Sequence, residues 1–106
     1  MKTKWQIEFD FEQARKQANR LDDIADQLEH LAKKQIERYN QELPSYWRGK
    51  SASLFQKKQD EMKKNVLQSA RELRQQAECI RRIARLLYEA EMAALEIARR
   101  RAYTDG

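Results

Sequence analysis

Helix-breaking residues are almost absent, and their placement divides the 106-residue chain in two. The only proline is Pro44, and the two glycines are Gly49 and the last residue, Gly106. Proline disfavours helical backbone in the residue before it, and glycine adopts backbone angles that other residues avoid. The chain therefore predicts two long regular elements joined by one turn at 44–51.

Both elements have the pattern of amphipathic helices. The charged fraction is 37% and the hydrophobic fraction is 41%, a composition typical of long helices. Apolar residues recur at helical spacing on both sides of the turn. This predicts one helix at about 10–43 and a second at about 51–102. The main stripe positions are Ala14, Ala18, Leu21, Ala25, Leu28, Ala32, Tyr39 and Leu43, then Phe55, Met62, Val66, Ala70, Leu73, Ala77, Ile80, Ala84, Leu87, Ala94 and Ala98.

The ends of the helices carry cap signals. Trp5, Ile7 and Phe9 alternate with polar residues, and this period of two predicts an extended lead-in over residues 1–9. Asp10 is the predicted N-cap of the first helix, with Gln13 at the capping-box distance. Ser51 or Ser53 is the predicted cap of the second helix.

The predicted fold is all-α: a two-helix antiparallel hairpin formed by a single domain over residues 1–106. Two amphipathic helices cover one face of each other but enclose no core. We therefore expect the hairpin to pair with a second helical hairpin into a four-helix bundle. The residues predicted at the dimer or partner interface are Leu21, Leu28, Tyr39, Phe55, Val66, Leu73, Ile80 and Leu87.

Enzymatic and metal chemistry have little support in the sequence. His30 is the only histidine and Cys79 the only cysteine, and neither has a partner at metal-ligand or catalytic spacing. We predict no enzyme, no cofactor and no metal. There is no apolar run of the roughly 20 residues that a membrane span needs, and no apolar core of a cleavable signal peptide at the start.

The net charge of +5 permits acidic partners of several kinds. Basic residues are interleaved with acids around both helices, which argues against nucleic-acid binding. A basic coiled-coil adaptor or a nucleic-acid-binding dimer stays open as the alternative function.

The turn carries a family resemblance. Trp47-Arg48-Gly49 lies between two long helices, and Ala52 and Phe55 follow at the spacing WxGxxAxxF. The chain resembles the small WXG proteins of type VII secretion over roughly residues 7 to 98. The resemblance implies a helical hairpin that forms homodimers or heterodimers, with Trp47 and Gly49 shaping the turn.

The resemblance also implies a route and partners. Such proteins are exported folded by a membrane-embedded ATPase, so the expected location is cytoplasmic before export and then secreted or at the cell surface. The expected role is an exported subunit or a chaperone-like targeting partner. The helical partner would be a second hairpin or the N-terminal helices of a larger toxin, for example of the LXG type.

The C-terminal export signal departs from the family pattern Tyr-x-x-x-Asp/Glu. Tyr88 is followed four residues later by Met92, whereas Leu87 and Glu91 fit a looser pattern of a hydrophobic residue and an acid. Leu87 and Glu91 are therefore the candidate export segment. The departure leaves open whether this chain carries its own signal or depends on that of a partner.

Overall fold

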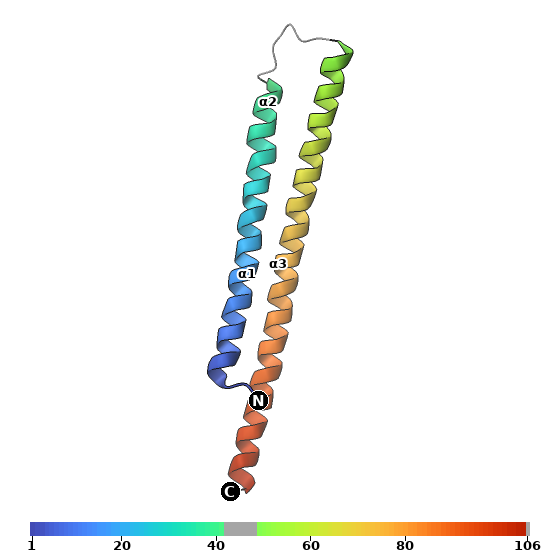
Figure 1. Cartoon of the computed structure of the whole chain (residues 1–106). Helices are drawn as coiled ribbons and strands as arrows, with labels where there is room; N and C mark the ends of the chain where they lie inside the picture. The colour runs from blue at the N-terminus through green and yellow to red at the C-terminus, as the bar shows by residue number, and fades with distance from the viewer. Residues whose placement is uncertain (42–48, 106) are drawn as a thin grey trace. The chain divides into compact units, whose positions relative to one another are not determined.

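A computed structural model describes residues 1–41 and 49–105, and every regular element in them is helical (Figure 1). Helix α1 spans Lys4–His30, a π-helical stretch η1 spans Leu31–Ile36, and α2 spans Glu37–Gln41. These three elements follow one another without a break. After Gly49, helix α3 spans Lys50–Asp105. The predicted all-α fold with two long helices is confirmed, and pairing into a four-helix bundle stays a prediction.

The predicted extended lead-in is wrong, because α1 begins at Lys4. The true capping box lies earlier than Asp10: the Thr3 hydroxyl accepts the Gln6 amide at 3.2 Å, and the Gln6 side chain accepts the Thr3 amide at 3.0 Å. Alternation over a few residues cannot separate a strand from an amphipathic helix. Ile7 is 2% exposed, while Trp5 and Phe9 lie one turn apart on the outer face, with stacked rings 5.2 Å apart.

The chain forms two compact units, each an antiparallel pair of helical segments. The first unit combines Met1–Arg20 with Gln76–Gly106. In it, residue numbers rise along α1 as they fall along α3: the tilted rings of Phe11 and Tyr88 lie 5.0 Å apart, and further along Arg81 donates to the Asn19 side chain at 2.9 Å. The two contacts therefore show that the helical segments of this unit are antiparallel.

The second unit, Leu21–Gln75, repeats the arrangement with ion pairs. Arg74 lies 2.6 Å from Asp26 and 2.9 Å from Glu29, and further along Lys63 pairs with Glu37. Hydrogen bonding and charge from Lys63 hold the pKa of the Glu37 carboxyl below its ordinary value of 4.5. These ion pairs lie at the solvent-exposed edges of the unit, where such pairs add little to the free energy of unfolding. Their main effect is to favour this alignment of the two helical segments.

Alanines form most of the buried core in both units. Ile7 and six alanines are the buried apolar residues of the described chain. Each set of three alanines follows a heptad spacing: Ala18, Ala25 and Ala32 in the first half, and Ala70, Ala77 and Ala84 in the second. Small side chains at the contact let helix backbones approach closely. The larger apolar residues therefore lie beside the contact, where they are only partly covered.

We expect Ala70→Leu to destabilise the protein by about 1–3 kcal/mol, because Ala70 is 0% exposed and extra methylenes would force the helices of its unit apart. Chemical denaturation measures the change. Ala102→Leu, at an exposed position of α3, is the matched control and should change little. Equal stability of Ala70→Leu and the control would contradict close helix packing at this alanine.

Candidate functional sites

Gly49 is the described part of the W-x-G motif; Trp47 and Arg48 lie outside the described residues. Gly49 has φ of +99°, a conformation that glycine adopts readily and other residues rarely. Its carbonyl oxygen accepts the Ser53 amide at 3.1 Å, so Gly49 is the N-cap of α3. Ser51 and Ser53, the predicted caps, both lie inside α3, and that prediction is wrong.

The requirement for glycine at this position is conformational, because a Cβ built on Gly49 would meet nothing within 4 Å. The other two motif residues, Ala52 and Phe55, are half-buried in the first turns of α3. The motif thus starts the second helix and places its first apolar side chains.

The candidate export segment lies beside the beginning of the chain in the first unit. Leu87 is 55% exposed, and the Tyr88 ring next to it packs on Phe11. Glu91 is more protected, with 28% of its side chain exposed. A cavity of about 80 Å³ opens here, lined by Lys2, Ile7, Asp10, Phe11, Ala14, Ala84, Leu87, Tyr88 and Glu91.

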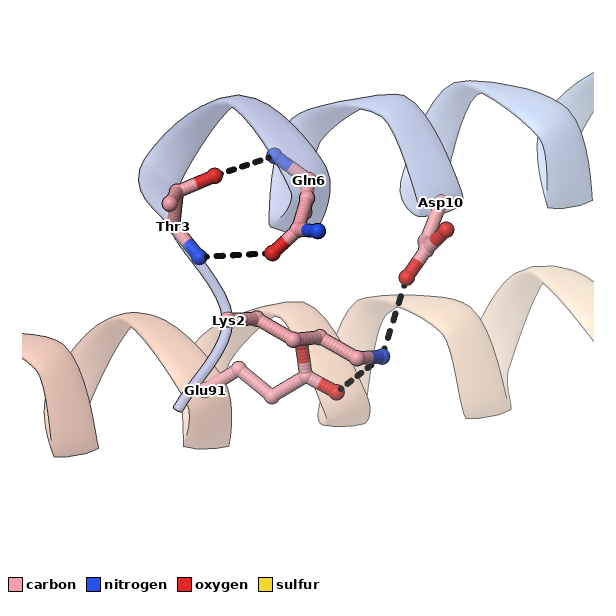
Figure 2. Close-up of polar contacts among 5 residues, drawn as sticks. All are labelled: Lys2, Thr3, Gln6, Asp10 and Glu91. Carbon is pink, nitrogen blue, oxygen red and sulfur yellow. Dashed lines mark hydrogen bonds and ion pairs between the residues drawn. The ribbon is translucent and has the colours of Figure 1, made fainter.

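Lys2 joins the two helices across this cavity. Figure 2 shows its ammonium between the carboxylates of Asp10 on α1, at 2.9 Å, and Glu91 on α3, at 3.2 Å. The hydrogen bonds to Asp10 and then Glu91 raise the pKa of Lys2 above its ordinary value of 10.5. We call this three-residue network the N-terminal clasp.

Sequence reasoning identified Glu91 but missed Lys2 and Asp10. Asp10 was predicted to cap a helix, whereas it lies in the second turn of α1 and pairs with Lys2. The sequence Thr3-x-x-Gln6 is the signal that could have corrected this, because it is a capping box that moves the helix start upstream. The contact with Glu91 has no signature in the sequence.

The predicted interface residues are mostly half-buried beside the helix contacts. Leu87 is exposed. Tyr39 lies in α2, and nothing is described of its side chain. The half-buried residues of the set are Leu21, Leu28, Phe55, Val66, Leu73 and Ile80. The half-buried side chains keep part of their apolar surface in water. Their role at a partner interface stays a prediction.

Metal-ligating groups do not gather in the described residues 1–41 and 49–105: no three His, Cys, Asp or Glu side chains lie close enough to hold an ion. Cys79 is an exposed free thiol. Over the same residues, no helix is sufficiently long and apolar to span a membrane.

The family model described as proteins of 100 residues with WXG matches residues 6–92. This chain is a WXG protein. The match covers most of the chain, including the W-x-G turn and the candidate export segment. No curated protein and no solved structure is significantly similar to it. As a WXG protein it is a small protein associated with type VII secretion, from a family of helical proteins that this pathway exports.

We expect Gly49→Ala to destabilise the WXG protein by about 1 kcal/mol, because an L-residue is strained at a positive φ. Gly49→Asn should cost less, since asparagine tolerates such angles better. Thermal unfolding of both variants tests this, and equal stability of Gly49→Ala and the parent protein would show that the turn adapts freely.

We expect Lys2→Gln to open the N-terminal clasp and speed amide hydrogen exchange in the first turns of α1. The increase should stay below about tenfold, because exposed ion pairs are weak. Glu91→Gln should give part of the same effect, and the double variant should add little to Lys2→Gln alone. Lys4→Gln is the control in the same turn; an equal response there would mean that general charge, not the clasp, orders this end.

Proposed function

We propose that this WXG protein works without catalysis, as an exported subunit or a targeting partner that binds another helical protein in type VII secretion. Family membership supports the pathway. The observation that supports pairing with another helix is a row of apolar side chains on α1 and η1 that the second unit leaves partly exposed. We call this row the α1 seam; it consists of Leu21, Ile24, Leu28 and Leu31.

This seam has the steps of three and four residues that place side chains on one packing face of a helix. Ile24 is 44% exposed and Leu31 is 36% exposed, while Leu21 and Leu28 are half-buried. Covering such side chains with a partner helix removes apolar area from water at roughly 25 cal/mol per Å². The seam therefore favours association with a second amphipathic helix.

The partner that supplies this amphipathic helix is a second hairpin or the N-terminal helices of a larger toxin. A helical partner adds its own stripe to the seam and completes a bundle. The candidate export segment, Leu87 and Glu91, would then be presented to the export ATPase from the assembled complex. Glu91 pairs with Lys2 in the N-terminal clasp, which links this part of α3 to the start of the chain.

The basic-adaptor alternative gains no support from the placement of the cations. Several arginines and lysines are engaged by acids: Arg74 by Asp26 and Glu29, Lys63 by Glu37, and Arg15 by Glu12. Cations neutralised in this way contribute less to phosphate binding.

We expect Ile24→Glu to weaken binding to the co-purifying helical partner at least about tenfold, because a charge would be buried in the seam. Circular dichroism should show the helix content unchanged, since position 24 is exposed in the free chain. Gln27→Glu, at an exposed position on α1, is the control. The readouts are partner affinity by calorimetry and the secreted fraction in the producing cell.

A second experiment tests the candidate export segment. The variant Glu91→Gln should reduce the secreted fraction of the protein without loss of partner binding. If Ile24→Glu and Gln27→Glu bind the partner equally, pairing through the α1 seam is wrong. If Glu91→Gln leaves secretion unchanged, the export signal lies elsewhere.

A further inference from the structure

The two residues of the candidate export segment differ in how far they are exposed to water. Leu87 is 55% exposed, whereas only 28% of the Glu91 side chain is exposed. Glu96, further along the same helix, pairs with Arg100 at 3.3 Å and still keeps 55% of its side chain exposed. An ion pair along the surface of α3 therefore leaves a carboxylate open, and the protection of Glu91 has another cause.

That cause is Lys2, which reaches Glu91 from the residues just before α1. Figure 2 shows the Lys2 ammonium between two acids, at 2.9 Å from Asp10 and 3.2 Å from Glu91. Glu91 also borders the cavity of about 80 Å³ whose walls include Phe11 and Tyr88. The Oε1 atom of Glu91 already accepts a hydrogen bond from Lys2, so a receptor that binds this oxygen has to displace Lys2.

The clasp is built so that it closes and opens without disturbing the helices. Asp10 holds the Lys2 ammonium from α1, and its hydrogen bond to Lys2 is the shorter of the two. Lys2 precedes the Thr3 cap, so its side chain swings away from Glu91 without breaking a backbone hydrogen bond of α1. Both ion pairs are partly exposed to water, where such pairs are weak. The contact is therefore one that a competing group is able to replace.

We propose that the N-terminal clasp is autoinhibitory: Lys2 covers the acid of the candidate export segment, and a receptor binds the complete segment only when Lys2 has moved away. This inference rests on the proposed function, in which Leu87 and Glu91 form the export segment, and it adds the regulation of that site. With the clasp closed, a receptor meets Leu87 while Glu91 is engaged. With the clasp open, it meets both residues.

The clasp also defines the chemistry of the receptor group. The group that binds Glu91 takes the place of an ammonium, so it is a basic side chain, and the cavity beside Phe11 and Tyr88 is the space for its aliphatic stem. An arginine competes best with Lys2, because its guanidinium donates two parallel hydrogen bonds to a carboxylate. The apparent affinity of the receptor is lowered by the fraction of the protein in which the clasp is closed.

Carboxyl labelling of the full chain tests whether Lys2 covers Glu91. A water-soluble carbodiimide with an excess of a small amine modifies exposed carboxylates, and peptide mass spectrometry compares Glu91 with the exposed Glu89. Lys2→Gln should raise the relative labelling of Glu91 by about threefold, which an exposed ion pair of ordinary strength supports. Lys2→Arg, which keeps the cation, and Lys4→Gln, which removes a neighbouring one, should leave it unchanged. Equal labelling of Glu91 in Lys2→Gln and in the parent protein would overturn the proposal.

The rate of secretion from the producing cell tests the regulatory role. Lys2→Gln should raise this rate by about threefold, in proportion to the open fraction of the clasp, whereas Lys2→Arg should stay at or below the rate of the parent protein. The double variant Lys2→Gln/Glu91→Gln should match Glu91→Gln alone, because without the acid there is nothing for Lys2 to cover. Circular dichroism and the total amount of protein in the cell verify that the variants fold alike.

The failure of this inference is distinguishable from the failure of the proposed function. If Glu91→Gln lowers secretion while Lys2→Gln does not raise it, the export segment stands and autoinhibition is wrong. If Lys2→Gln lowers secretion as Glu91→Gln does, the clasp positions the acid instead of covering it, which also overturns autoinhibition. If Glu91→Gln leaves secretion unchanged, the export segment itself is wrong, and autoinhibition fails with it.

Discussion

Close contact between helices through alanine is the constraint on which the rest of the structure depends. Alanines at heptad spacing are buried to between 0% and 8% exposure in both units, and among the described side chains Ile7 is the only large one that is fully buried. Contacts of this kind bring backbones near one another but remove little apolar area from water. The leucines and isoleucines that would form the core of a thicker domain are therefore displaced to the sides, where a partner can cover them.

The distribution of glycine and proline made the helical fold predictable from the sequence, because Pro44 and Gly49 are the only strong helix breakers inside the chain. The heptad rows were also visible, but the depth of burial at each position was not. Alanines and leucines recur with the same period, so the period alone cannot tell which row faces the other helix of the pair. Packing distance decides that question, and it depends on both helices at once.

The start of α1 could not be predicted because two rules conflicted over the same residues. Alternation of Trp5, Ile7 and Phe9 favoured a strand, whereas the Thr3–Gln6 capping box favoured a helix. The helix prevails since Ile7 can be buried against α3 while the Trp5 and Phe9 rings stack on each other outside. The clasp between Lys2 and Glu91 joins residues 89 positions apart, which no local pattern encodes.

In the first unit, α3 carries the contact with α1 and the candidate export segment within a few turns of each other. One helix can present both because successive residues point about 100° apart around its axis. Ala84 faces the helix contact, Glu91 reaches the clasp, and Leu87 remains half in water. Leu87 is therefore the residue of the candidate export segment that stays most open to water, while Glu91 is engaged by Lys2.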